Sequence, residues 1–316
     1  MKTLLLIDAN ALVHRCFHAL PPFSTKSKKP VGAIYGLASI LIRIFREQKF
    51  DGSAPLTINL LESESRSRRP EYGRRIDFIA AFFDRPEPTF RKEIFKEYKA
   101  HRPKAPDELV SQIIEAHKLF NSFQIKTFEI PGFEADDLIG TSVEKFKKIS
   151  DLRIIILTGD LDILQLVEDD NDKVLVETIK KGISETVFYN EAAIKERYGV
   201  KPSQLPDYKG LVGDPSDNIP GVPGIGPKTA APLISKYGSL ENLLEKGGQE
   251  KAYKKIFEFQ DQALLSRNLS VIRRDTPLDL DIADLKYSGL SKKEAISYFE
   301  ELGFKSLVDR INLMKY

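Results

Sequence analysis

Hydrophobic residues gather in three short runs along the chain, and each run is followed by aspartate. The runs cover residues 3–7, 76–83 and 153–157, and the aspartates that follow them are Asp8, Asp84, Asp160 and Asp162. Short, mostly apolar runs of this length are typical of strands buried on both faces of a sheet. We therefore expect these aspartates at the carboxyl ends of parallel strands, where α/β proteins bind their ligands.

Helical periodicity separates the three runs, at residues 32–45, 108–123 and 134–148. Strands that alternate with helices predict an α/β fold, in which a mostly parallel central sheet is flanked by helices.

The pattern changes near residue 187, where short helices separated by Gly and Pro replace the alternation. We expect an α/β domain over residues 1–186 and a smaller helical region over residues 187–316. Within the first domain, residues 52–75 are polar and alternate Ser with Arg, which predicts an exposed insertion.

Composition excludes several protein classes. The 316 residues are 41% hydrophobic and 30% charged, which excludes a wholly disordered chain. The single cysteine, Cys16, excludes an internal disulfide and a multi-cysteine zinc site, and it favours a cytosolic setting. No apolar stretch approaches the roughly 20 residues of a membrane helix. We expect a cytoplasmic protein with no membrane partner.

Basic residues concentrate in a segment that we call the basic arm, residues 85–104. The formal net charge of +2 does not by itself predict a nucleic-acid partner, but this arm carries seven Lys or Arg against three Glu. It also contains Phe90, Phe95 and Tyr98, and cations interleaved with aromatic rings suit single-stranded nucleic acid. A solvated amphipathic helix is the alternative interpretation. Because the arm follows Asp84, it should overhang the same edge of the sheet.

Further acidic residues occur at a helix start and in a loop. Glu134, Asp136 and Asp137 follow Pro131 and Gly132, and the loop GDPSDN contains Asp214 and Asp217. Each set alone is compatible with compensation of a helix dipole or with turn formation. If the sets converge in space, their desolvation and repulsion would cost several kcal/mol per ion without counter-charge. Oxygen ligands of this kind suit Mg²⁺ or Mn²⁺, and two such ions can hydrolyse a phosphodiester without a protein nucleophile.

A glycine-rich motif, GVPGIGPKT at residues 221–229, is typical of a helix-hairpin-helix. Its backbone amides can approach the sugar-phosphate backbone of a nucleic acid without reading the bases. A tight glycine turn without a ligand is the alternative, and the spacing excludes a Walker loop. His14 and His18 share one helix face but have no third ligand, so we interpret them as structural or substrate-contacting residues.

Together these motifs resemble the 5′–3′ exonuclease domain of bacterial DNA polymerase I, within the flap endonuclease family. The matching segments are LIDANALVHR, AFFD, FKEYKAHRP, PGFEADD, TGDLDILQLV and KGLVGDPSDNIPGVPGIGPKTA. The resemblance implies a structure-specific nuclease with a helical arch near residues 85–112 and a helix-hairpin-helix (helix-three-turn-helix) near residues 211–236. It would act on DNA with a 5′ flap, nick or 5′ end, including an RNA primer–DNA hybrid, as a monomer.

The resemblance also implies a role for individual residues. It places two Mg²⁺ or Mn²⁺ ions, the first near Asp8, Asp84, Glu134, Asp136, Asp160 and Asp162, and the second near Asp162, Asp214 and Asp217, with Asp137 in the outer shell. It implies catalytic roles for Lys99, Arg102 and Arg15. DNA-binding residues would be Tyr98 in the basic arm and, in the hairpin, Gly221, Gly224, Gly226, Lys228 and Thr229, where relatives also bind K⁺.

The sequence departs from the family pattern at His14, where Tyr is usual, and at Leu161, where Lys is usual. The chain ends where the nuclease domain ends, so we expect either a stand-alone nuclease or a fragment. Two other functions stay open: a non-catalytic DNA-binding module, and a ribonuclease of the related acid-cluster type. The full carboxylate set favours the nuclease, because a pure binder gains nothing from negative charge that faces phosphate.

Overall fold

The computed structural model describes residues 1–47, 75–169, 173–183 and 185–314. The insertion predicted at residues 52–75 lies, except for Arg75, outside the described residues. No helix of the described chain is long and apolar enough to cross a membrane.

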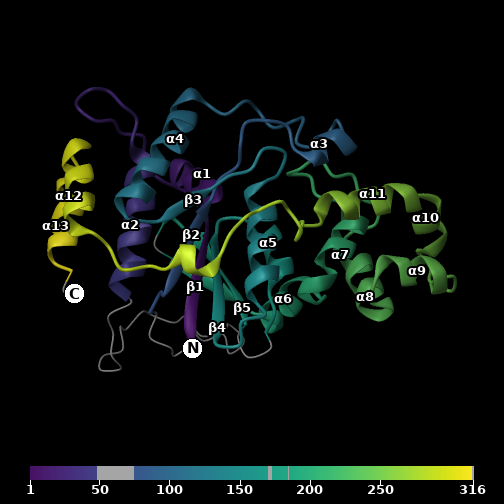
Figure 1. The fold of residues 1–316 in the computed structure, drawn as a ribbon. Coiled ribbons are helices and arrows are strands. Elements are labelled where there is room, and N and C mark those ends of the chain that lie inside the picture. The colour runs from purple at the N-terminus through teal and green to yellow at the C-terminus, as the bar shows by residue number, and fades with distance from the viewer. Residues whose placement is uncertain (48–74, 170–172, 184, 315–316) are drawn as a thin grey trace.

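A sheet forms the centre of the molecule (Figure 1). It has six strands in the order β3-β2-β1-β4-β5-β6. The strands are β1 (Lys2–Asp8), β2 (Phe78–Phe82), β3 (Lys126–Phe128), β4 (Leu152–Thr158), β5 (Val174–Lys181) and β6 (Glu185–Tyr189). All neighbours pair in parallel except β5 and β6, which pair antiparallel. The predicted α/β class and the three predicted strands, β1, β2 and β4, are confirmed. Because these three are adjacent and parallel, their aspartates meet at one edge.

Helices cover both faces of the sheet because alternate residues of β1 enter different cores. Leu5 and Ile7 pack with α1 (Ala9–Ala19), α2 (Gly32–Glu47) and α4 (Asp107–Ser122). Leu4 and Leu6 pack with α5 (Ala135–Phe146), α6 (Glu191–Tyr198) and η1 (Asp162–Leu166). The sheet is therefore buried on both faces, as its continuous apolar runs predict.

A group of helices beyond β6 continues the second core. It consists of η3 (Pro202–Gln204), α7 (Leu205–Val212), α8 (Pro227–Tyr237), α9 (Leu240–Lys246), α10 (Tyr253–Glu258) and α11 (Gln260–Ser270). These helices extend from one end of the sheet (Figure 1).

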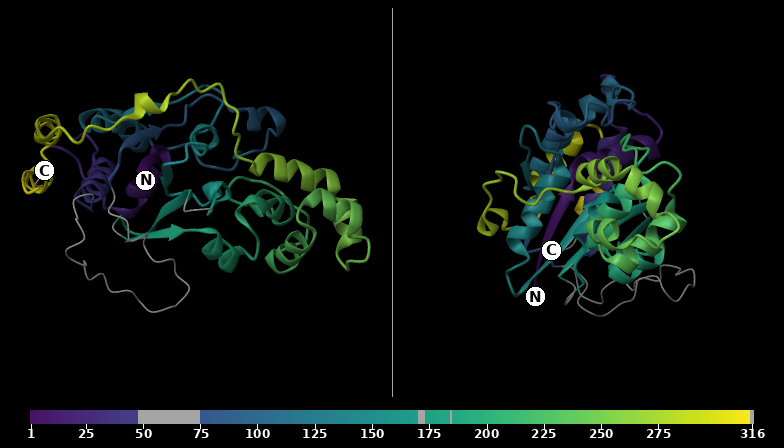
Figure 2. Two further views of the ribbon diagram at one scale, coloured as in Figure 1. Left: turned by 60° about the horizontal axis from the view of Figure 1, so that its bottom comes forward. Right: turned by 90° about the vertical axis from the view of Figure 1, so that its right-hand side faces the viewer.

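The last two helices are separate from that group. The chain returns across the molecule through η4 (Ile282–Leu285) to α12 (Lys292–Glu301) and α13 (Lys305–Asn312), at the opposite end from α8–α10 (Figures 1 and 2). Phe299 and Phe304 join the core of α2 and α4. The prediction of one helical region over residues 187–316 therefore needs correction: β6 spans its start, and its last two helices belong to the other core.

The basic arm is mostly not helical. Only α3 (Phe90–Ile94) forms a helix within it, and turns and extended chain continue to α4. The predicted helical arch over residues 85–112 is thus helical only in α3 and at the start of α4. Pro103 and Pro106 account for the non-helical chain just before α4, because proline disfavours helix in the residue that precedes it.

Candidate active site

The carboxyl edge of the sheet fixes Asp8 and Asp84 through backbone and side-chain donors. Asp8 ends β1 and caps α1, where it accepts hydrogen bonds from the Ala11 amide (3.0 Å) and from the Thr158 hydroxyl (2.6 Å). Asp84 follows β2 and accepts from the Ala135 amide (2.7 Å) at the first turn of α5. Both carboxylates are therefore oriented by the fold rather than by a cation.

Asp136 and Asp160 complete a group of acids at this edge. Burial raises the pKa of Asp8 to about 7 against the lowering effect of its hydrogen bonds, and Asp84 and Asp160 raise it further. Burial also raises the pKa of Asp136 well above its usual value, and Asp8, Asp160 and Asp84 add to the effect. Desolvation is likewise the main cause of the raised pKa of Asp84. These acids lie close enough to repel one another, as their predicted convergence requires.

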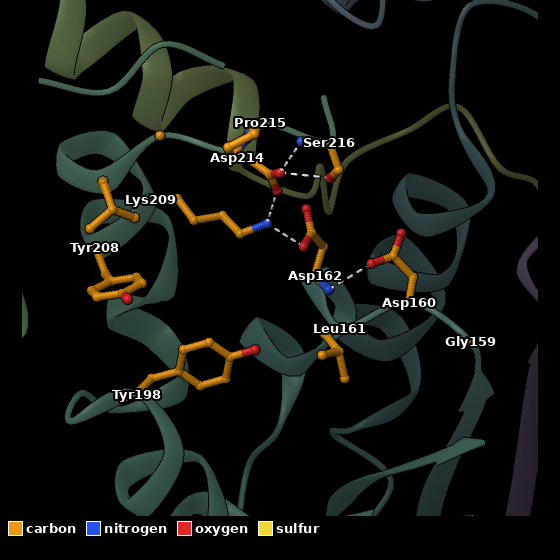
Figure 3. A pocket seen from close by; sticks show the side chains of 12 residues that line it. Gly159, Asp160, Leu161, Asp162, Tyr198, Tyr208, Lys209, Asp214, Pro215 and Ser216 are labelled. Atoms are coloured by element: carbon orange, nitrogen blue, oxygen red, sulfur yellow. Dashed lines mark hydrogen bonds and ion pairs between the residues drawn. The ribbon is translucent and has the colours of Figure 1, made fainter. Parts of the chain in front are cut away.

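A second set of acids is paired with basic side chains. Lys209 bridges Asp162 and Asp214, with its Nζ 2.6 Å from Oδ2 of Asp214 (Figure 3). Burial would raise the pKa of Asp214, but Lys209 and Ser216 outweigh it and lower the pKa. For Asp162 burial prevails, and the pKa rises to about 6 despite Lys209.

The basic arm supplies the remaining cations. Nζ of Lys99 lies 2.8 Å from Oε2 of Glu134 and 3.7 Å from Oδ2 of Asp217. Arg102 also pairs with Asp217. Lys99 has a φ of 54°, a left-handed conformation that few non-glycine residues adopt, and its amide donates to the Asp217 carbonyl (2.9 Å). Local strain of this kind is common at functional sites.

The donor set fits hard divalent cations. It consists of carboxylate oxygens, which Mg²⁺ and Mn²⁺ prefer. Two of these carboxylates, Asp8 and Asp136, have raised pKa values because they are buried beside other acids. Within the described part of the chain, no three His, Cys, Asp or Glu side chains are gathered closely enough to hold an ion in this arrangement. Basic side chains instead contact several of the predicted ligands, namely Glu134, Asp162, Asp214 and Asp217.

Tyr98 does not fit its predicted DNA-binding role. Its side chain is buried, with 4% of the residue exposed, so it cannot stack on a base. Its hydroxyl lies 3.0 Å from Asp217 Oδ2 and 3.3 Å from Glu134 Oε2. Tyr98 therefore orients two predicted metal ligands.

Asp137, which is predicted in the outer shell of the metal site, is held by protein donors. Arg91 donates to both of its oxygens (2.7 and 2.8 Å), and the amides of Arg273 and Glu134 donate to them as well. Asp137 is completely buried, and these four donors saturate it. Its role here is to hold the start of α5, which presents Glu134 and Asp136.

The predicted hairpin forms between α7 and α8. Gly221 has a φ of 61°, and a Cβ there would lie 2.3 Å from the Gly213 nitrogen, so only glycine fits. Among the described residues, the amides of Gly224 and Gly226 find no hydrogen-bond acceptor. Lys228 is exposed in the first turn of α8, next to Thr229. The loop thus presents backbone donors and a cation together.

Two family models match this chain. Residues 3–199 match the family model "5′-3′ exonuclease, N-terminal resolvase-like domain", and residues 200–293 match "5′-3′ exonuclease, C-terminal SAM fold". The chain belongs to the 5′–3′ exonuclease family. This exonuclease and flap endonuclease family acts on DNA.

Curated relatives in the family include longer proteins. DNA polymerase I of Bacillus subtilis is 37% identical over 313 residues, which cover 98% of this chain and 32% of that protein. The chain thus spans about a third of the length of the polymerases it matches. A 5′-3′ exonuclease of Aquifex aeolicus is 35% identical over 313 residues, covering 99% of this chain and 96% of that protein.

Solved structures share the fold. The 5′-exonuclease of bacteriophage T5 with bound divalent metal ions (zinc) has a TM-score of 0.61 and 20% identity, covering 99% of this chain and all of that one. The T5 flap endonuclease in a complex with DNA and metal ions has a TM-score of 0.59 and 21% identity, covering 98% and 97% of the two chains.

The sequence analysis missed Lys209, Arg91 and Thr158 as parts of the site. Lys209 begins the quoted segment KGLVGDPSDN, five residues before Asp214, and that spacing across a helix end could have indicated a pair. Arg91 lies in the basic arm but is buried, and no local signal distinguishes it from its exposed neighbours. Arg15 lies partly buried on α1, and its catalytic role stays a prediction.

Proposed function

We propose that this chain is a divalent-metal-dependent 5′ nuclease that cleaves phosphodiester bonds of DNA at 5′ ends, nicks and 5′ flaps. The observation that carries the proposal is the crowding of Asp8, Asp84 and Asp136 at one sheet edge with raised pKa values. A binding module for phosphate would be weakened by such charge, whereas two divalent ions would neutralise it.

Two ions, Mg²⁺ or Mn²⁺, would bind between the carboxylates. Asp8, Asp84, Asp136 and Asp160 would hold the first together with Glu134, and Asp162, Asp214 and Asp217 the second. When bound, such ions acidify a water molecule and stabilise both the attacking and the leaving oxygen.

Lys99 and Arg102 would contact the scissile phosphate. Both already lie among the carboxylates, and their side chains are 27% and 48% exposed, so a substrate can reach them. A cation placed where negative charge develops stabilises the transition state. On substrate binding, Lys99 and Arg102 would leave their carboxylate partners and contact the phosphate instead.

The hairpin would hold the duplex away from the cleavage site. Gly224 and Gly226 offer unbonded amides, and Lys228 adds a positive charge. Contacts of this kind fix position without selecting sequence. K⁺ at the hairpin carbonyls remains part of the proposal, as does an RNA primer–DNA hybrid as a second substrate.

A labelled 5′-flap duplex tests the proposal. We expect cleavage with Mg²⁺ or Mn²⁺ and none with a chelator, with a product of defined length at the flap junction. Asp160→Asn should abolish cleavage but keep DNA binding, whereas Asp284→Asn, at an exposed site that pairs with Lys126 at the amino end of β3, should behave as wild type. Binding should weaken steeply with salt.

Two results would contradict the nuclease. One is an intact flap after incubation of the wild type with either metal under conditions in which it binds the duplex, which would leave the non-catalytic module. The other is full activity of Asp160→Asn, which would remove this carboxylate from the metal site.

A further inference from the structure

Lys209 joins two acids that belong to different segments. It lies near the end of α7, and its ammonium contacts Asp162 at the start of η1 and Asp214 in the loop after α7 (Figure 3). The three side chains are only 14–23% exposed. The contact is therefore a partly buried bridge, which salt screens less than a surface ion pair.

The ammonium keeps its charge at this position. Lysine is a cation at neutral pH, and both of its partners here are carboxylates, with Nζ 2.6 Å from Oδ2 of Asp214. A divalent ion that takes oxygens from the same two carboxylates would then meet a positive charge at contact distance. Like charges this close in a partly buried site repel strongly, so the lysine and the ion exclude one another.

Space for the lysine to move lies beside the bridge. Lys209, Asp162 and Asp214 line an open pocket of about 430 Å³, and its other lining residues include Leu161, Tyr198 and Tyr208 (Figure 3). The rings of Tyr198 and Tyr208 meet edge to face, with centroids 6.0 Å apart. A lysine side chain has a flexible four-carbon stem, which can pack along such rings while its ammonium stays hydrated.

We propose that Lys209 competes with the second divalent ion: it bridges Asp162 and Asp214 in the metal-free protein and moves toward Tyr198 and Tyr208 in the same pocket when the ion binds. The inference rests on the proposed function only in assigning a divalent ion to these carboxylates. Its consequence is that the second ion binds more weakly than its ligands alone would allow.

Binding of Mn²⁺ without DNA tests the inference. The electron paramagnetic resonance signal of free Mn²⁺ reports binding directly, and wild type, Lys209→Met and Lys209→Arg are compared. We expect Lys209→Met to bind its weaker ion roughly 10-fold more tightly, the scale on which groups next to metal ligands act. Lys209→Arg should resemble wild type because it keeps the charge. Lys236→Met, which removes a surface lysine paired with Glu250 at 2.6 Å, is the matched control.

Thermal unfolding separates competition from a structural role. In chelator, Lys209→Met should melt below wild type, because Asp162 and Asp214 lose their shared cation. Adding Mn²⁺ should then raise its melting temperature more than that of wild type. A merely structural lysine would lower the melting temperature without tightening Mn²⁺ binding. Should Lys209→Met not fold, Lys209→Gln serves for the same pair of measurements.

The results distinguish the inference from the proposed function. Unchanged or weaker Mn²⁺ affinity in the neutral variants overturns the inference, even if the wild type cleaves flaps. Tighter affinity together with a wild type that leaves flaps intact supports the inference and refutes the nuclease.

Discussion

The acids of the site form two groups that differ in their counter-charge. The inner group consists of Asp8, Asp84, Asp136 and Asp160, and the outer group of Glu134, Asp162, Asp214 and Asp217. No inner acid forms an ion pair in the described chain. The inner acids instead accept hydrogen bonds from backbone amides, from the Thr158 hydroxyl and from the side-chain amide of Asn10. Every outer acid contacts Lys or Arg.

This difference shows where the fold leaves negative charge uncompensated. The pKa of inner Asp136 is raised well above its usual value, whereas that of outer Asp214 is lowered. The pKa of Asp162 is intermediate, because burial raises it to about 6, Lys209 lowers it and Asp160 raises it. The inner group therefore depends on an external cation, and the outer group already has an internal one.

The largest expected effect comes from Asp136→Asn. Flap cleavage should fall by at least about 10³-fold, the upper end for loss of one electrostatic contact in a transition state. The same change should raise the free energy of unfolding in chelator at pH 7.5, because it removes one of several repelling charges. Single-turnover cleavage and urea unfolding measure the two effects.

Asp214→Asn is the matched outer variant. It should also reduce cleavage, but its stability in chelator should fall, since Lys209 and Ser216 lose the charge they stabilise. If Asp136→Asn and Asp214→Asn changed the free energy of unfolding in the same direction, the distinction between inner and outer acids would be contradicted.

Lys99→Ala should have the next largest effect. We expect kcat to fall by about 10²-fold through lost charge stabilisation, with Mn²⁺ binding maintained or tightened because Glu134 loses a competing cation. Lys96→Ala, an exposed lysine three residues away in the basic arm, is the control and should retain wild-type kcat. A wild-type rate in Lys99→Ala would remove this lysine from the reaction.

The smallest expected effect is a pH dependence of stability without metal. The pKa of Asp8 is about 7 in the folded protein against 3.8 as its ordinary value, so the folded state binds more protons between these limits. Its stability should therefore decline as pH rises from about 4 to about 7, by up to about 1.4 kcal/mol for each pH unit. Urea unfolding at pH 5 and pH 7.5 measures it, and Mg²⁺ should reduce the decline. Equal stability at both pH values in chelator would contradict the uncompensated inner group.

The inner group could be predicted from sequence because its positions follow from strand ends. Continuous apolar runs identify buried parallel strands, and residues at their carboxyl ends must meet at one edge. By contrast, β5 was missed because its second half, ETIKK, is polar and resembles a loop. β3 has only three residues, too few for a period-2 signal.

The tertiary contacts of individual side chains could not be predicted, because a residue type does not specify which other residues it will contact. Tyr98 looks like a stacking residue among cations, yet it turns inward to Glu134 and Asp217. The apolar faces of α12 and α13 require a core, but nothing local indicates that α2 and α4 supply it. Asp137 and Asp136 are neighbours in sequence, and only the buried Arg91 separates their roles.

Arg91 also joins three parts of the chain at one point. Its guanidinium contacts Asp137 in α5 and the carbonyls of Leu269 and Val271 at the exit of α11, while its backbone belongs to α3. None of these segments can open without breaking the same buried contacts. We therefore expect three segments to open as one cooperative unit: α3, the start of α5 and the end of α11. Their backbone amides should show similar protection from hydrogen exchange.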